Sequence, residues 1–178
     1  MRTLAILFTI ILSVWMIGCK TKAQTENRTT RPISELSYSE LEKKNFPKAL
    51  YFVNDFEHLL NNDQILDLEI LINDYRVKTK REIVIVTVDS INPYKDLPNY
   101  TVDLSNYLGV GKDGNGITIV VSKKLRSVQI STGIETEKII TDEDCKKVID
   151  KLMIPNFKKD KNYEGLKTGL LELIRIWE

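Results

Sequence analysis

The segment Gly109–Gly116, GVGKDGNG, contains the spacing G-x-G-x-x-G, which is typical of loops that bind the pyrophosphate of a dinucleotide. That chemistry requires a strand before the glycines and a helix after them, because the helix N-terminus faces the pyrophosphate. Here a helical pattern ends at Leu108, and a β-branched run follows Gly116. The order is reversed. We therefore predict a left-handed helix cap at Gly109 and a tight turn after it, with no nucleotide bound through this stretch.

Oxygen-bearing side chains flank the two strands that follow this turn. Asp113 and Asn115 precede the first strand, whereas Glu137 and Asp142 come after the second. If the two strands form a hairpin, the start of the first lies beside the end of the second, so both segments reach the same sheet edge. Clustered carboxylates repel one another, and a divalent cation with oxygen ligands relieves that repulsion. The pattern favours a metal site at this edge.

Each of these residues also has an ordinary structural explanation. Asp113 can shape the turn, and Asp142 can stabilise the positive end of the helix that Thr141 caps. Glu135, between the two groups, is expected to be a solvated loop residue.

Nucleophilic catalysis has no support in the sequence. His58 is the single histidine, and no Ser or Cys is placed beside it to form a triad. Cys145 lies on the apolar stripe of a predicted helix and is expected in the core. Gly165 and Gly169, four residues apart, indicate close helix packing.

The elements that position these residues follow from hydrophobic periodicity. Continuous β-branched runs indicate strands buried on both faces, and one later strand alternates apolar and polar residues. The predicted helices cover 61–81, 97–107, 145–153 and 166–177, and the predicted strands cover 83–88, 117–121 and 127–132. This order predicts an α/β fold in which a hairpin is added to a parallel core.

The N-terminus resembles a lipoprotein signal peptide. Arg2 is followed by an apolar run over 4–17 that is too short to span a membrane, where about 20 residues are needed. The ending Met-Ile-Gly-Cys resembles a lipobox, which predicts cleavage after residue 18 and a lipid on Cys19. The alternative is a plain cleaved signal followed by an incidental cysteine.

The rest of the chain divides into a tether and a domain. Residues 19–45 are expected to be the lipidated cysteine and a polar tether, and 46–178 a single domain. The chain carries 26 Lys and Arg against 25 Asp and Glu, so no strong field favours nucleic acid. These features predict a bacterial cell-envelope protein, held on a membrane by its lipid, with its domain outside the cytoplasm.

An ordered set of short motifs resembles the TPM domain family, also described as thylakoid-lumen phosphatase-like. The resemblance covers about residues 46–177. It rests on the segments Val53-Asn54-Asp55, Asn115-Gly116, Thr132-Gly133, Glu137 with Thr141-Asp142, Pro155-Asn156-Phe157-Lys158 and Tyr163-Glu164-Gly165-Leu166.

This resemblance implies a three-layer α/β/α sandwich, a mixed sheet flanked by helices. It implies a divalent metal, usually calcium with magnesium as the alternative, held by acids that map onto Asp55, Asp113 or Asn115, Glu137 and Asp142. Topology alone places Asp55 at the opposite sheet edge, and only the resemblance brings it to the cluster. The chain also departs from the family pattern at Glu135, where a second glycine is common, and at Gly114, where the family carries an acid.

Three functional hypotheses follow. The first is a membrane-tethered, metal-binding domain that acts as an interaction or accessory module, with an envelope protein as a possible partner. The second is a metal-dependent acid phosphatase in which Glu137 or Asp142 acts as a base. The third is a structural α/β domain that binds no metal.

Overall fold

The computed structural model of the chain describes residues 40, 44 and 46–178. Pro32–Glu178 form one compact unit. The predicted signal peptide, Cys19 and nearly all of the predicted tether lie outside the described residues. No helix among the described residues is both long enough and apolar enough to cross a membrane.

A four-stranded mixed sheet forms the centre of the fold. Its strands, in spatial order, are β1 (Val53–Asp55), β2 (Glu82–Thr87), β3 (Gly116–Ser122) and β4 (Ser127–Thr132). β1, β2 and β3 are parallel, and β4 pairs antiparallel to β3. The predicted hairpin on a parallel core is therefore confirmed. The sequence did not reveal β1, because three residues are too few to show a period.

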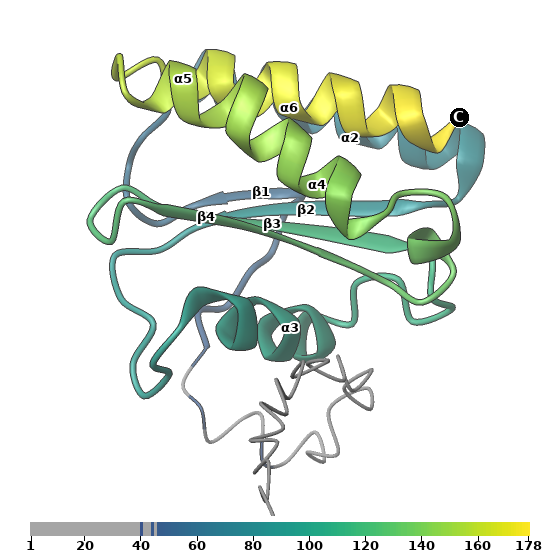
Figure 1. Cartoon of the computed structure of the whole chain (residues 1–178), viewed down its shortest axis with the longest axis horizontal. Helices are drawn as coiled ribbons and strands as arrows, with labels where there is room; N and C mark the ends of the chain where they lie inside the picture. The colour runs from purple at the N-terminus through teal and green to yellow at the C-terminus, as the bar shows by residue number, and fades with distance from the viewer. Residues whose placement is uncertain (1–39, 41–43, 45) are drawn as a thin grey trace, which may run out of the picture. The chain divides into compact units, whose positions relative to one another are not determined.

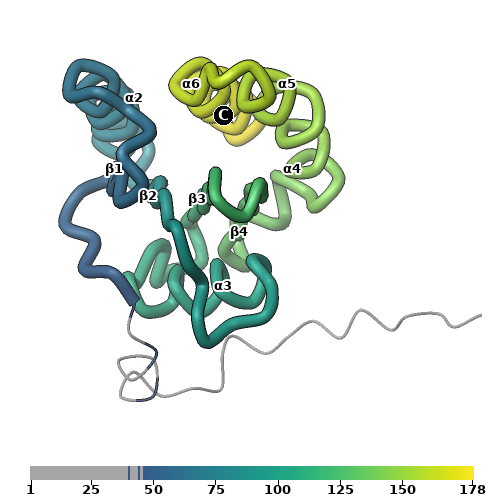
Figure 2. Tube along the Cα trace, turned by 90° about the vertical axis from the view of Figure 1, so that its left-hand side faces the viewer, coloured from purple at the N-terminus to yellow at the C-terminus, as the bar shows by residue number. Residues whose placement is uncertain are grey.

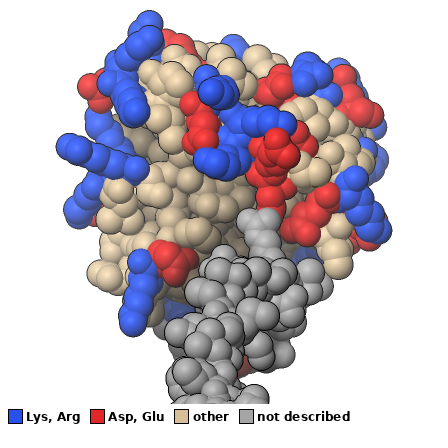
Figure 3. Space-filling view, viewed as in Figure 1, with Lys and Arg blue, Asp and Glu red and all other residues tan. Residues whose placement is uncertain are grey.

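Helices cover both faces of the sheet (Figures 1 and 2). α2 (Asn62–Thr79), α4 (Asp142–Val148) and α6 (Asn162–Trp177) lie on one face, and α3 (Leu97–Leu108) lies on the other. The expected three-layer α/β/α sandwich is thus confirmed. Figure 3 shows basic and acidic side chains interleaved over the outer surface of the helical layer, in keeping with the balanced charge of the chain.

The two parallel connections have opposite hands. The step from β1 to β2 and the step from β2 to β3 run in the same direction across the sheet. The first passes through α2 and the second through α3, on opposite faces. One connection is therefore left-handed, which departs from the strong right-handed preference of such units.

Local signals set the ends of the helices. Asn61 caps α2 and forms a capping box with Gln64. Thr141 caps α4 in the same way with Asp144. Gly109 ends α3 in the left-handed conformation, with φ of 70°. The predicted helix cap at Gly109 is confirmed.

The predicted helix over 145–153 is more irregular than expected. α4 ends at Val148, a π-helical turn covers Ile149–Met153, and α5 (Ile154–Phe157) follows. The two glycines of α6 lie against this segment. A Cβ on Gly165 would lie 2.4 Å from the Phe157 ring, and one on Gly169 would lie 2.3 Å from the Met153 methyl group. The prediction that these glycines serve helix packing is confirmed.

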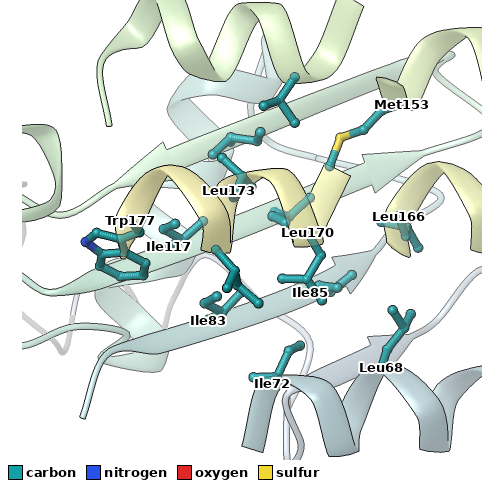
Figure 4. Close-up of a cluster of buried hydrophobic side chains, with 14 of the residues drawn as sticks. Leu68, Ile72, Ile83, Ile85, Ile117, Met153, Leu166, Leu170, Leu173 and Trp177 are labelled. Atoms are coloured by element: carbon teal, nitrogen blue, oxygen red, sulfur yellow. The ribbon is translucent and has the colours of Figure 1, made fainter. Parts of the chain in front are cut away.

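Side chains alternate between two cores along β2 and β3. Ile83, Ile85 and Ile117 pack against α2 and α6 (Figure 4), and Ile119 belongs to the same core. Val86 and Val120, the next residue along each strand, pack against α3 on the other face. Both strands are therefore buried on both faces, as their continuous apolar runs predicted.

The smaller core is closed by aromatic rings. Phe46 lies 5.3 Å from the ring centroids of both Tyr100 and Tyr107, and 5.8 Å from that of Tyr94. Burial raises the pKa of Tyr100 to about 12, so the phenol is neutral at physiological pH. The segment before β1 thereby fastens to the α3 side of the sheet.

Ile72 and Ile70 offer a matched test of this packing. Ile72 is fully buried in the larger core, whereas Ile70 on the same helix is 53% exposed. We expect Ile72→Ala to lower the free energy of unfolding by about 2–5 kcal/mol, since it leaves a cavity. Ile70→Ala should change it by less than about 0.5 kcal/mol. Chemical denaturation measures both, and equal effects would contradict the assigned helix face.

Candidate functional site

The two loops predicted to converge do meet at one end of the sheet. Gly133 N–H donates to Gly116 O at 2.9 Å, and Glu135 and Thr136 N–H both donate to Gly114 O at 3.1 Å. We call this end, with its loops 109–115 and 133–141, the carboxylate edge. It brings Asp113, Asn115, Glu137 and the start of α4 to the same end of the sheet, as the hairpin argument predicted.

Glycine is required here because the loop backbones nearly touch. A Cβ on Gly133 would lie 2.3 Å from Gly114 O. Gly111 has φ of 60°, and a Cβ there would lie 2.4 Å from Gly116 N. The glycines of the G-x-G-x-x-G spacing thus pack one loop against another, and the element that follows them is strand β3.

The carboxylates at this edge are engaged in local contacts. Asp113 accepts hydrogen bonds from Asn115 N–H at 2.9 Å and from the Asn115 side chain at 3.3 Å. These bonds, the backbone one first, lower the pKa of the Asp113 carboxyl. Glu135 pairs with Lys138 at 2.6 Å. Glu137 accepts a long 3.4 Å hydrogen bond from Thr132, and Asp142 is exposed in the first turn of α4.

The described residues do not form a preassembled metal site. Among them, no group of three or more His, Cys, Asp or Glu side chains is placed to hold an ion. Asp113 and Asn115 bond to each other, and Lys138 already neutralises Glu135. Calcium or magnesium at this edge would require side chains to leave these partners, so metal binding stays a prediction from the residue pattern and the resemblance.

Asp55 lies at the opposite end of the sheet, away from the other predicted ligands. It pairs in register with Thr87 at the carboxyl end of β2, whereas Gly116 pairs with Glu82 at the other end. Its carboxylate accepts hydrogen bonds from Thr87 Oγ1 at 2.6 Å, Leu59 N–H at 3.0 Å and Leu60 N–H at 2.8 Å. Topology therefore placed Asp55 correctly, and its placement in the cluster by resemblance was wrong.

A chain of hydrogen bonds runs from Asp55 to the β3–β4 turn. Thr87 Oγ1 accepts from Glu57 N–H at 2.9 Å. The Glu57 carboxylate in turn accepts from the backbone N–H groups of Lys123 at 2.8 Å and Lys124 at 3.0 Å. The spacing of residues in the sequence did not reveal Glu57 and Thr87, because their partners lie between 30 and 67 positions away in the chain.

Beside this turn lies an open hollow of about 890 Å³. Its apolar wall comes from Val121, Val128, Ile154 and Phe157, and its polar rim includes Lys123, Lys124, Arg126 and Lys158. The β3–β4 turn and the α5–α6 segment are joined by an ion pair of 3.0 Å between Lys123 and Asp160. We call the two segments, with Lys123, Lys124, Arg126, Lys158, Lys159 and Lys161, the basic tip.

Neither the described cysteine, Cys145, nor His58 is placed as a reactive nucleophile. Cys145 is buried, and burial, with Asp144 and Glu137 nearby, raises the pKa of its thiol to about 11. The thiolate that nucleophilic chemistry needs is therefore disfavoured. His58 is exposed, with φ of 55°. The prediction of a core cysteine is confirmed.

Comparison with known proteins places the chain in a family. The model of the TPM domain matches residues 53–176. The chain belongs to the TPM domain family. Every motif that carried the resemblance lies within the matched residues, and β1 opens the match. A comparison with curated proteins found no match.

Two solved structures share this TPM fold. The N-terminal domain of a protein from P. gingivalis is 26% identical, with a TM-score of 0.66, and the match covers 81% of this chain and 89% of that one. The N-terminal domain of the Corynebacterium glutamicum protein cg2496 is 14% identical, with a TM-score of 0.57, and the match covers 74% of this chain and 83% of that one. The second likeness shows the fold alone.

Asp55 is expected to serve stability. Asp55→Ala removes a charged acceptor from three donors, and we expect it to lower the free energy of unfolding by about 2–4 kcal/mol. Asp55→Asn keeps one carbonyl oxygen as an acceptor and should lower the free energy of unfolding by about half as much. Asp74→Asn, on the exposed side of α2, is the control and should be near neutral. Chemical denaturation measures the free energy of unfolding of each variant. An unchanged value for Asp55→Ala would contradict the assigned hydrogen bonds.

Calcium titration tests the carboxylate edge. Because its acids are engaged locally, we expect no saturable rise in the melting temperature of residues 32–178 at micromolar calcium. Differential scanning fluorimetry measures this, with magnesium in parallel. A saturable rise that Glu137→Ala and Asp142→Ala abolish would show that the edge rearranges into a metal site.

Proposed function

We propose that this TPM domain is a non-covalent interaction module of the bacterial cell envelope, held at a membrane surface by a lipid on Cys19. The sequence supports the anchor through the signal-like segment 1–18 and the Cys that follows it. In this proposal the α/β domain of residues 46–178 follows the predicted tether. In this proposal the domain acts by contact with a partner at the membrane, as an accessory to envelope proteins.

The observation that carries the proposal is how the acidic side chains are used. The carboxylate of Asp55, the acid in the family-like V-N-D motif, accepts hydrogen bonds from Thr87, Leu59 and Leu60. A hydrolase of this kind would need either a metal to activate water or an exposed nucleophile with a base. The described residues present cations and an apolar wall at the hollow, which suit binding rather than bond cleavage.

A phosphatase is the second candidate, and one observation favours it. Arg126 and Lys158 lie on the rim of the hollow and have the charge to hold a phosphoryl group. However, Arg126 lies in the turn just before β4, at the end of the sheet away from Glu137 and Asp142, the proposed bases. A phosphomonoester assay with calcium or magnesium decides between the two. Turnover lost in Glu137→Gln would support the phosphatase and overturn the interaction module.

Replacement of the predicted lipid site tests the anchor. In the full chain expressed in a bacterial host, we expect the wild-type protein in the membrane fraction and Cys19→Ala in the soluble envelope fraction. Metabolic labelling with a fatty acid should mark the wild-type protein alone. Cys145→Ala is the matched control, because the other cysteine is buried in the domain. Membrane recovery of unlabelled Cys19→Ala would contradict the anchor.

A further inference from the structure

We propose that the basic tip docks onto an anionic phospholipid surface, with Leu125 entering the headgroup layer. The inference rests on the proposed envelope function for its setting, since a lipid on Cys19 would hold the domain beside a bilayer. It goes further by naming the face of the domain that meets the membrane.

Charge at the basic tip is strongly one-sided. Six cations belong to it, Lys123, Lys124, Arg126, Lys158, Lys159 and Lys161, and all six are exposed. Three carboxylates face them. Asp160 pairs with Lys123 at 3.0 Å, Asp89 pairs with Lys124 at 3.3 Å, and Glu57 accepts from backbone amides. The two ion pairs are between side chains that are 55–78% exposed, so water screens them and an anionic surface can replace them.

Figure 3 shows the same imbalance over the surface. Lys and Arg side chains gather along the left edge of the view, where the β3–β4 turn and the α5–α6 segment project in Figure 1. Over the rest of that face the two signs alternate. The tip is therefore a local basic surface on a chain whose overall charge is close to neutral.

Leu125 gives this surface an apolar point. It lies in the turn between Lys124 and Arg126 and is 45% exposed. Burying the aliphatic Leu125 side chain at the headgroup boundary is favourable, because it removes apolar surface from water. The neighbouring cations can contact lipid phosphates at the same time. A soluble anion would use the cations and leave Leu125 exposed, so this combination favours a membrane.

The turn is held in place before any contact. Lys123 and Lys124 donate their backbone N–H groups to Glu57, whose own N–H donates to Thr87 Oγ1. Asp55 accepts from the Thr87 hydroxyl and completes the chain. Arg126 adopts a left-handed φ of 51°, which closes the tight turn. The backbone of the turn therefore needs little further ordering when the domain docks.

The hollow beside the turn suits one lipid headgroup. Its apolar wall suits the glycerol part of a phospholipid, and its rim of Arg126 and Lys158 suits the phosphate. The tether predicted over 20–45 would give the domain a reach of roughly 30 Å from the anchor. A weak contact suffices at that effective concentration.

Vesicle sedimentation with residues 32–178 tests the proposal without the anchor. This unit contains both hydrophobic cores whole. We expect it to bind vesicles of phosphatidylcholine with one-third phosphatidylglycerol, and to leave vesicles of phosphatidylcholine alone unbound. Binding should weaken as salt rises, because exposed charges carry it.

Matched variants locate the docking face. Lys124→Ala with Lys158→Ala should weaken partitioning by about fivefold per cation removed. Lys78→Ala with Lys112→Ala removes the same charge from exposed positions at the other end of the sheet and should bind as the wild type does. Leu125→Ser should weaken binding, whereas Leu171→Ser, at 44% exposure on α6, should not. Melting curves confirm that each variant is folded.

Three results would overturn the inference: equal binding to neutral and anionic vesicles, no binding to either, or an equal loss of binding in the tip pair and the control pair. Inorganic phosphate or an acidic peptide that binds the tip in the absence of vesicle binding would reassign it to a soluble anion. Failure here leaves the envelope proposal standing, because the Cys19→Ala fractionation measures the anchor independently.

Discussion

Two-sided burial of β2 and β3 is the constraint on which the rest of the structure depends. Their side chains alternate between two cores, so each face of the sheet must be covered by helices. α2 and α6 cover one face and α3 covers the other. Connecting neighbouring parallel strands across opposite faces forces one left-handed connection, which the packing of both cores evidently tolerates.

Burial of both faces leaves the two ends of the sheet to carry polar chemistry. At the carboxylate edge, Asp113 accepts hydrogen bonds within its own turn and Glu135 pairs with Lys138. At the other end, a chain of hydrogen bonds through Asp55, Thr87 and Glu57 holds the turn of the basic tip in place. The domain therefore has one end where Asp113 and Glu135 make local contacts and one where cations face outward.

Asp55 shows how a family-associated acid can serve the fold. Its three donors come from β2 and from the chain that leads into α2, so it ties the shortest strand to its neighbour. The same bonds support Glu57 and, through it, the turn. The charge of Asp55 suggests metal chemistry, but in this structure its hydrogen bonds support the distant β3–β4 turn.

The sequence by itself determined most of the helices, the buried strands, the hairpin and the caps at Gly109 and Thr141, because each depends on neighbours within a few positions. It also predicted that Asp113 and Glu137 reach one edge, since hairpin geometry is local. Only the tertiary structure decided what the carboxylates contact. The bonds from Asp55 to Thr87 and from Glu57 to Lys123 join residues far apart in the chain, and the three residues of β1 carry no period. Strand order and face placement, which bring such residues together, arise from burying two cores at once.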